Sequence, residues 1–144
     1  EIQPLIMENC VVKYDEAKKS QRQTKWQKIA NEAAKQCGRT VIPEIKPIIT
    51  LGEFLKSLPK SCNKIVCYEA ENNNGIKKLL DNTNSVDYCV FVGPEGGFSN
   101  NEIKICNENS CQPVTLGPRI LRTETASLAA ISIILYHKGD LGGF

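Results

Sequence analysis

The spacing of apolar residues along the chain alternates between strand-like and helix-like patterns. Residues 64–70 and 88–92 are short runs rich in β-branched or other apolar residues, and the second is continuous enough for a strand covered on both faces. Apolar residues at helical spacing predict one helix over 23–37 and another from Thr123 to about Lys138. This alternation is typical of an α/β domain with a mostly parallel sheet.

Shorter patterns complete the predicted elements. Ser99 and Glu102 have the spacing of a capping box, which begins a helix. The helix from Thr123 has almost no polar face, so we expect it to be buried in the core or against another subunit. The other expected elements are a strand within 2–6, a loop or helix approach over 13–25, short helices over 51–58 and 76–80, and a strand over 113–116.

Length and composition narrow the class of protein. The chain has 144 residues with 18 basic and 16 acidic side chains, for a net charge of +2, which fits one domain. This charge excludes a protein that coats a polyanion by bulk charge, but it allows a shaped, locally charged RNA site. We expect a cytoplasmic protein without a membrane span, since no apolar run reaches about 18 residues. Because the sequence begins at Glu1 inside an apolar stretch, we also expect a fragment.

The cysteines indicate neither a disulfide framework nor a zinc site. There are seven of them, an odd number, and His137 is the single histidine. We expect most to be reduced and to pack as small apolar residues, because they lie in or beside apolar runs. A four-thiolate metal site remains an alternative, with ligands Cys62, Cys67, Cys106 and Cys111.

The loop Gly93–Phe98 is the first segment with candidate chemistry. It follows the strand over 88–92, and glycines at the carboxyl end of a parallel strand let backbone amides approach a ligand. Its spacing matches neither the dinucleotide fingerprint nor the phosphate loop, which disfavours a nucleotide-phosphate site. A tight structural turn would explain the glycines, but a turn has no need of the Glu95 carboxylate.

The loop Leu116–Ala126 is the second such segment, and it places Arg119 and Arg122 before the last helix. A capping role for Thr123 and a helix-dipole role for the next residue would be ordinary helix features. A guanidinium near a helix N-terminus is electrostatically unfavourable, so the two arginines indicate an anion or a developing negative charge.

The end of the strand over 64–70 is the third candidate. Glu69 and Glu71 lie there, two residues apart. Such a pair is commonly a solvated turn, and a ligand role for Glu69 is the alternative.

Three blocks together resemble a known family. They are WQKIANEAAKQCGR at 26–39, VGPEGGFS at 92–99 and LGPRILRTETA at 116–126. In this order and spacing they are similar to the RsmE-type 16S rRNA uridine-N3 methyltransferases of the SPOUT superfamily, over nearly the whole chain.

The resemblance implies a SPOUT-type α/β fold, with a mostly parallel sheet flanked by helices and a deep trefoil knot in the C-terminal half. The chain from about Leu116 would thread under the earlier loops, and two subunits would form a homodimer through helices near the site. The family also carries an N-terminal β-barrel, PUA-like RNA-binding domain. We therefore expect residues 1–144 to be the methyltransferase domain without that barrel and without the domain's first strand and helix. The family's Ser-Glu-Arg reads Met7–Asn9 here, without the arginine.

The implied reaction transfers the methyl group of S-adenosylmethionine to N3 of a uridine in 16S rRNA, with small-subunit ribosomal RNA or the assembled small subunit as partner and no metal. Neutral uridine N3 carries a proton and is a poor nucleophile, so the site must remove the proton or stabilise the anion. Arg122 is the first candidate for stabilising that anion or its flanking phosphate. Glu95 and Glu124 are candidates for a general base or for positioning, and the residues alone do not rank them.

The resemblance also implies binding residues. Leu116 and Ile120 would pack on the adenine ring. The residues assigned to the cofactor are Glu69, Gly93, Pro94, Gly97, Leu116, Gly117, Ile120, Leu121 and Thr125. The residues assigned to RNA phosphates are Lys18, Lys19, Arg22 and Arg119, the first three within a basic cluster over 13–28 that could equally be a solvated loop.

Two other functions stay open. One is a non-catalytic dimeric α/β module that binds a nucleotide-like ligand or RNA. The other is a related SPOUT enzyme that acts on transfer RNA.

Overall fold

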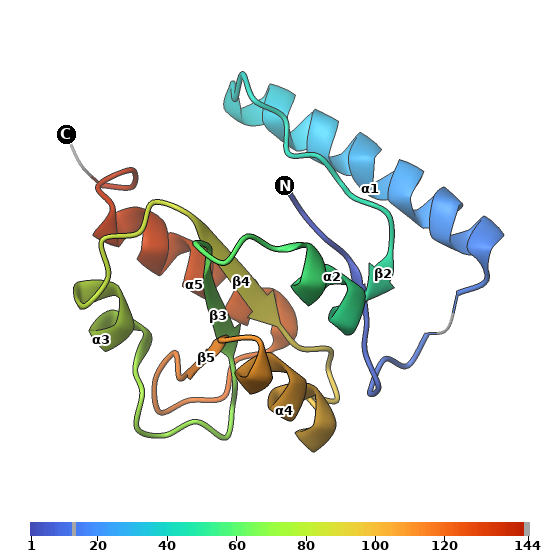
Figure 1. The fold of residues 1–144 in the computed structure, drawn as a ribbon. Helices are drawn as coiled ribbons and strands as arrows, with labels where there is room; N and C mark the ends of the chain where they lie inside the picture. The colour runs from blue at the N-terminus through green and yellow to red at the C-terminus, as the bar shows by residue number, and fades with distance from the viewer. Residues whose placement is uncertain (13, 143–144) are drawn as a thin grey trace. The chain divides into compact units, whose positions relative to one another are not determined.

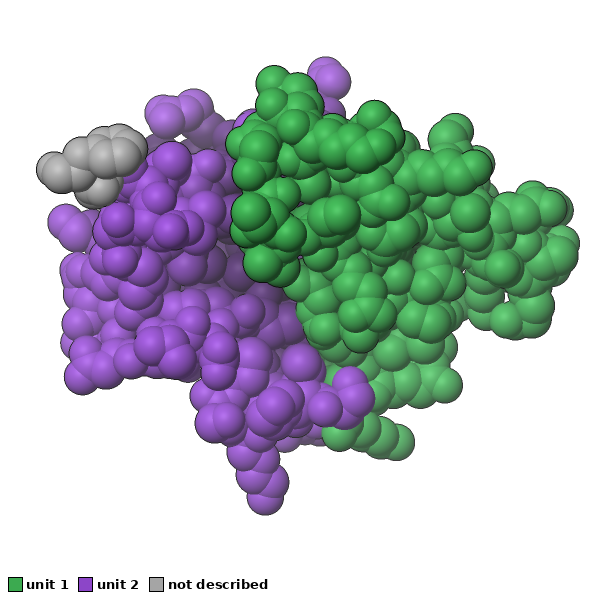
Figure 2. All heavy atoms as spheres, turned by 90° about the horizontal axis from the view of Figure 1, so that it is seen from above, with its two compact units in different colours: residues 1–6, 10–56 green, residues 7–9, 57–144 purple. Residues whose placement is uncertain are grey.

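The computed structural model describes residues 1–12 and 14–142, and the chain forms two compact units. Unit 1 contains residues 1–6 and 10–56, and unit 2 contains residues 7–9 and 57–144; Figure 2 colours them green and purple. Every strand pair among the described residues is parallel. The expected α/β architecture with parallel sheets flanked by helices is therefore confirmed.

Unit 1 is built around one long helix. α1 (Glu16–Cys37) begins where the Asp15 side chain accepts a hydrogen bond from the Lys18 amide, and it ends at Gly38, whose φ of 70° is left-handed. The two-stranded parallel sheet of this unit pairs β1 (Leu5–Ile6) with β2 (Ile49–Thr50), and α2 (Leu51–Ser57) follows.

The expectation of a loop or helix approach over 13–25 was wrong from residue 16 onward. The Asp15 cap and the Lys19–Glu16 ion pair at 2.6 Å favour helix seven residues earlier than the apolar spacing indicates. Gln27 then connects α1 to the following extended segment, since its amide donates to the Pro43 carbonyl and accepts from the Ile45 amide.

Unit 2 has a three-stranded parallel sheet in the order β4-β3-β5, which Figure 1 shows with β3 in the middle. Its strands are β3 (Asn63–Cys67), β4 (Tyr88–Val92) and β5 (Gln112–Val114). Its helices are α3 (Ile76–Asp81), α4 (Asn100–Glu108) and α5 (Thr123–His137). These bounds lie within a few residues of the sequence expectations.

The core of unit 2 lies where the sheet meets α3 and α5. Ile65 and Val114 of the sheet are fully buried, and they belong to one apolar cluster with Leu80, Ala130 and Ile134. Burial of this kind is the main stabilising contribution to a domain of this size. The cluster fixes the sheet and α5, from which the loops at the strand ends extend.

α5 is less buried than its sequence predicts. Ala126, Ala130 and Ile134 face the core, whereas the side chains of Leu128 and Ile131 are 69% and 50% exposed. The expectation that the helix lies in the core thus holds for one face only. Among the described residues, no helix has both the length and the apolar character needed to cross a membrane.

The start of α5 also differs from the prediction of a Thr123 cap. The N-cap residue is Arg122, whose side chain forms no capping hydrogen bond, and Thr123 is the first helical residue. The Arg122 guanidinium therefore belongs to the loop and remains available to a ligand.

Candidate functional site

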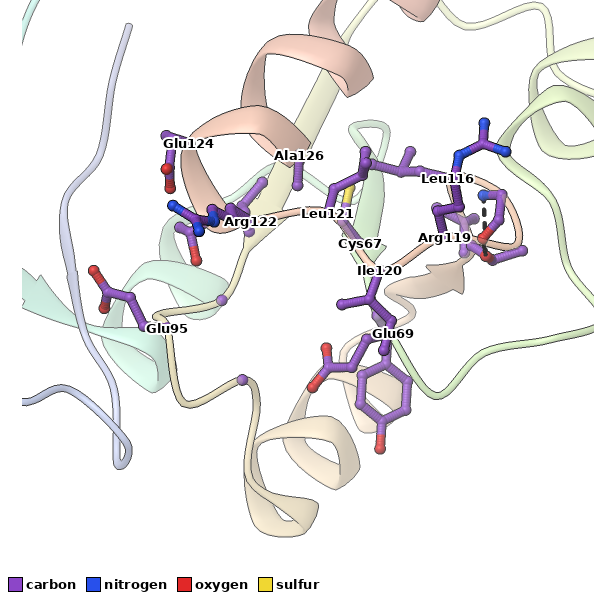
Figure 3. A pocket seen from close by; sticks show the side chains of 18 of the residues that line it. Cys67, Glu69, Glu95, Leu116, Arg119, Ile120, Leu121, Arg122, Glu124 and Ala126 are labelled. Atoms are coloured by element: carbon purple, nitrogen blue, oxygen red, sulfur yellow. Dashed lines mark hydrogen bonds between the residues drawn. The ribbon is translucent and has the colours of Figure 1, made fainter.

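An open cavity of about 910 Å³ lies at the carboxyl edge of the β4-β3-β5 sheet (Figure 3). The last residues of the three strands, Cys67, Val92 and Val114, all line it. Its walls are the segments that follow these strands, mainly 93–97 after β4 and 115–124 after β5. This is where open parallel sheets bind their ligands, and the volume suits a small organic molecule.

The cavity brings together nearly all the residues that the sequence assigned to catalysis and to the cofactor. The residues that line it include Glu69, Gly93, Pro94, Glu95, Gly97, Leu116, Gly117, Arg119, Ile120, Leu121, Arg122 and Glu124. Thr125 does not line it, and its cofactor role stays a prediction. Thr125 is exposed within the first turn of α5, and the helical rotation between neighbours turns Ala126 rather than Thr125 toward the cavity.

The glycine loop 93–97 has its shape because side chains would not fit in it. Gly97 has a φ of 70°, and a Cβ there would collide with the Glu69 carboxylate. A Cβ at Gly93 would lie 3.0 Å from the Phe98 ring, which is buried and packs edge-on against Tyr68 with 6.5 Å between ring centroids. The glycines are therefore needed for close packing as well as for turning the chain.

The second loop is shaped by Thr115 and Gly117. The Thr115 hydroxyl donates to the Gly117 carbonyl at 3.0 Å and accepts from its amide at 3.2 Å, and Gly117 has a φ of 133°. Within the described residues, the backbone amides of 120–122 have no hydrogen-bond partner in the protein. These amides just before a helix can bind an electron-rich group of a ligand.

The charged side chains of the cavity divide into two groups. In Figure 3, Glu95, Arg122 and Glu124 lie at one end, whereas Glu69 and Ile120 lie at the other. Across the part of the chain that is described, no hydrogen bond or ion pair with the protein is formed by the charged side chains of the cavity. These are Glu69, Glu95, Arg119, Arg122 and Glu124. Exposed charges of both signs in one cavity are typical of a site that binds a charged or zwitterionic ligand.

The two apolar residues expected at the ring behave differently. Leu116 is half-buried and packs against the core cluster of unit 2, so its position is fixed by the fold. Ile120 is 82% exposed, so most of its side chain is open to contact with a ligand or partner. Packing of both on an adenine ring remains a prediction.

Cys67 lies at the inner end of the cavity as an uncharged thiol. Burial raises its pKa to about 11, because the thiolate would lose its solvation there. It therefore contributes shape rather than charge or nucleophilicity. The described residues contain no cluster of three or more His, Cys, Asp or Glu side chains that could hold a metal ion.

Glu71 belongs to a turn, whereas its neighbour Glu69 faces the cavity. The Glu71 carboxylate accepts hydrogen bonds from the amides of Asn73 and Asn74, and these bonds lower its pKa. The lining residues that sequence reasoning did not assign include Asn72 and Thr115. The turn signal at 72–75 and the end of β5 were visible, but nothing in the sequence indicated that both lie beside the glycine loop.

The basic residues assigned to RNA lie elsewhere, except Arg119. Lys18, Lys19 and Arg22 are on α1 of unit 1, and Lys18 and Lys19 pair with Asp15 and Glu16. The Arg22 guanidinium lies 5.7 Å from the centroid of the Tyr14 ring. Lys13, from the same cluster, lies outside the described residues.

Comparisons with known proteins agree with this geometry. The family model of the RNA methyltransferase domain matches residues 1–135. The ribosomal RNA small subunit methyltransferase E of Bacillus subtilis is 33% identical over 97% of this chain and 57% of its own length, and that of Aquifex aeolicus is 36% identical over 92% and 55%. The chain thus spans somewhat more than half the length of these relatives.

A solved structure shows the same likeness in three dimensions. The crystal structure of a ribosomal RNA small subunit methyltransferase E from Neisseria gonorrhoeae, bound to S-adenosyl methionine, superposes with a TM-score of 0.81 at 36% identity. The superposition covers 92% of this chain and 54% of that one. The family match over most of the chain confirms the resemblance in the three sequence blocks. The chain belongs to the RNA methyltransferase domain family.

Proposed function

We propose that this chain is the methyltransferase domain of an enzyme that transfers a methyl group from S-adenosylmethionine to N3 of a uridine in 16S ribosomal RNA. The observation that supports it most is the cavity at the sheet edge, lined by both family loops, in a chain 36% identical to a protein crystallised with that cofactor. The family model supports this assignment of the domain, since it matches residues 1–135.

The cavity residues fit the cofactor. Its volume lies in the range of about 300 to 1,000 Å³ that is usual for small-molecule sites. The unpaired amides of 120–122 can bind the adenine, and the exposed Glu69 carboxylate can accept hydrogen bonds from ribose hydroxyls. When bound, S-adenosylmethionine supplies an electrophilic methyl group.

The residues at the other end of the cavity suit the uridine. Arg122 places a permanent positive charge where the N3 anion or a flanking phosphate would lie. Glu95 or Glu124 accepts the N3 proton or positions the base, and both carboxylates are exposed and without a partner among the described residues. The two loops would hold the uridine beside the cofactor, as methyl transfer between them requires.

We propose the knotted topology of the family for unit 2 as well. Because β3 lies between β4 and β5, the chain must cross from one side of β3 to the other through α4. It then crosses back, since α5, which follows β5, packs against β4. This return path supports the expected threading of the chain from about Leu116.

We propose that the domain forms a homodimer through α5. Leu128, Ile131 and Leu135 recur at helical spacing, and the first two are exposed apolar side chains. A second copy that presents the same stripe would bury both sets by two-fold symmetry.

Cofactor binding can be tested at Gly97. In isothermal titration, S-adenosylmethionine should bind the wild-type chain, and Gly97→Ala should weaken binding about 5- to 150-fold, because a strained φ and a clash with Glu69 cost about 1–3 kcal/mol. Gly52→Ala on α2, where a Cβ meets no atom within 4 Å, is the control and should bind normally. No binding by the wild-type chain would favour the non-catalytic alternative.

The catalytic assignment can be tested at Arg122. Arg122→Ala in the full-length protein should slow single-turnover methylation of undermethylated small-subunit particles about 100-fold or more, because the developing anion loses its positive partner. S-adenosylmethionine affinity should change less than about threefold, as expected for a group that acts on the transition state. Arg39→Ala serves as the control, and a near-normal rate for Arg122→Ala would refute the role.

RNA binding by α1 can be tested by charge reversal. If Lys18 and Lys19 follow RNA phosphates, reversing both to Glu should weaken RNA binding and reduce the slope of log K against log salt by about one to two. The same reversal at Lys77 and Lys78, an exposed pair on α3, is the matched control. An unchanged slope in the α1 variant would identify a solvated helix face.

The dimer can be tested at the same stripe on α5. Ile131→Lys should shift the sedimentation profile from dimer to monomer, because a buried unpaired ammonium opposes association. Val86→Lys, at a position 87% exposed in unit 2, should leave the profile unchanged. A monomeric wild-type chain at micromolar concentration would contradict the proposal.

A further inference from the structure

The tripeptide Met7–Asn9 belongs to a different compact unit from its neighbours along the chain. Residues 1–6 and 10–56 form unit 1, whereas residues 7–9 belong to unit 2. Met7 is buried to 8% exposure, so the tripeptide is packed rather than merely adjacent. Its partners in unit 2 are residues of α4 and of the glycine loop.

One buried carboxylate holds this tripeptide. Glu102 is only 4% exposed, and its Oε1 accepts a hydrogen bond of 2.8 Å from the Glu8 amide. Its Oε2 accepts another of 2.8 Å from the Ser99 amide, as part of the capping box of α4. Both carboxylate oxygens of Glu102 therefore accept hydrogen bonds. Glu102 thus connects the tripeptide to Ser99, which follows the glycine loop and Phe98. A capping box alone would need only one of them.

Asn9 extends the connection to the glycine loop itself. Its Nδ2 donates to the carbonyl oxygens of Gly96 and Gly97, each at 3.1 Å. A Cβ at Gly96 would lie 2.9 Å from the Asn9 Cβ, so the two backbones are also in close contact. The loop therefore meets the tripeptide on one side and Glu69 on another.

The orientation of the Gly96 and Gly97 carbonyl groups also determines the backbone conformation between them. Peptide groups are planar, so fixing two successive carbonyls fixes the peptide planes on both sides of Gly97. The angle between those planes is the conformation of Gly97, whose φ of 70° is one of two regions a glycine adopts with similar ease. Asn9 thus selects the loop conformation that lines the cavity.

We propose that Asn9 and Glu102 are positioning residues of the S-adenosylmethionine pocket. Glu102 holds the tripeptide, and Asn9 holds the glycine loop in its binding conformation before the cofactor arrives. Neither residue lines the cavity, so both act through the loop backbone. The inference rests on the proposed cofactor, but not on the identity of the RNA.

Asn9→Asp is the sharpest test, because it keeps the shape of the side chain and replaces its two N–H donors with an oxygen. Facing two carbonyl oxygens, that carboxylate should repel the loop, so S-adenosylmethionine should bind about tenfold more weakly in isothermal titration. Asn9→Ala, which only removes the hydrogen bonds, should give a smaller loss. Asn107→Ala, at an exposed position of α4 outside the cavity, is the control.

Hydrogen exchange of the cofactor-free chain gives an independent readout. In Asn9→Asp the amides of Gly97 and Phe98 should exchange faster, while those of the β3 core keep their protection and the thermal midpoint stays within about 2 °C. Glu102→Gln keeps one acceptor and should also speed exchange at Glu8. If Glu102→Gln fails to fold, the Asn9 variants still decide the question.

The outcomes separate this inference from the proposed function. If the wild-type chain fails to bind S-adenosylmethionine, the proposed function and this inference both fail. If the wild-type chain binds and Asn9→Asp binds equally well, only this inference is wrong. A loss of affinity with a matching loss of core protection would show a general structural role and would overturn the positioning role.

Discussion

The parallel pairing of β3 with β4 on one side and β5 on the other is the constraint on which the rest of unit 2 depends. In this register Cys67 is paired with both Val92 and Val114, so the three strands end at the same level. The loops that follow β4 and β5 therefore begin close together, although they are more than 20 residues apart in the chain. A one-residue slip would turn every side chain of a strand to the other face and separate these loops.

The pocket combines rigid backbone with unpaired charge. Glycines at 93 and 97, the Thr115–Gly117 hydrogen bonds and the Phe98 ring shape the loops, and none of the charged side chains of the cavity takes part. Arg122 stands at the N-terminus of α5, where the helix dipole disfavours a positive charge, and no side chain neutralises it among the described residues. An unpaired positive charge of this kind can stabilise negative charge on a bound ligand.

The sequence was sufficient for the elements and for most of the pocket, because both depend on local patterns. The run at 88–92 and the Ser99–Glu102 pair predicted β4 and the start of α4, and the two family loops predicted the cavity walls. The missed features depend on contacts distant in sequence or on side-chain direction. Asp15 extended α1 beyond its apolar pattern, and the Asn9 side chain forms a hydrogen bond with a loop 87 residues away.

The hydrogen bond between Glu8 and Glu102 has a consequence for the order of events during synthesis. Its partners are separated by 94 residues, so the tripeptide leaves the ribosome long before the carboxylate that holds it. Closing so long a loop costs entropy that is recovered only when β3, β4 and α4 are already packed. A nascent chain that ends before α4 contains β3 and β4 but lacks Glu102, so its tripeptide has no partner for the Glu8 amide. The tripeptide therefore acquires its hydrogen-bond partner only after α4 has been made.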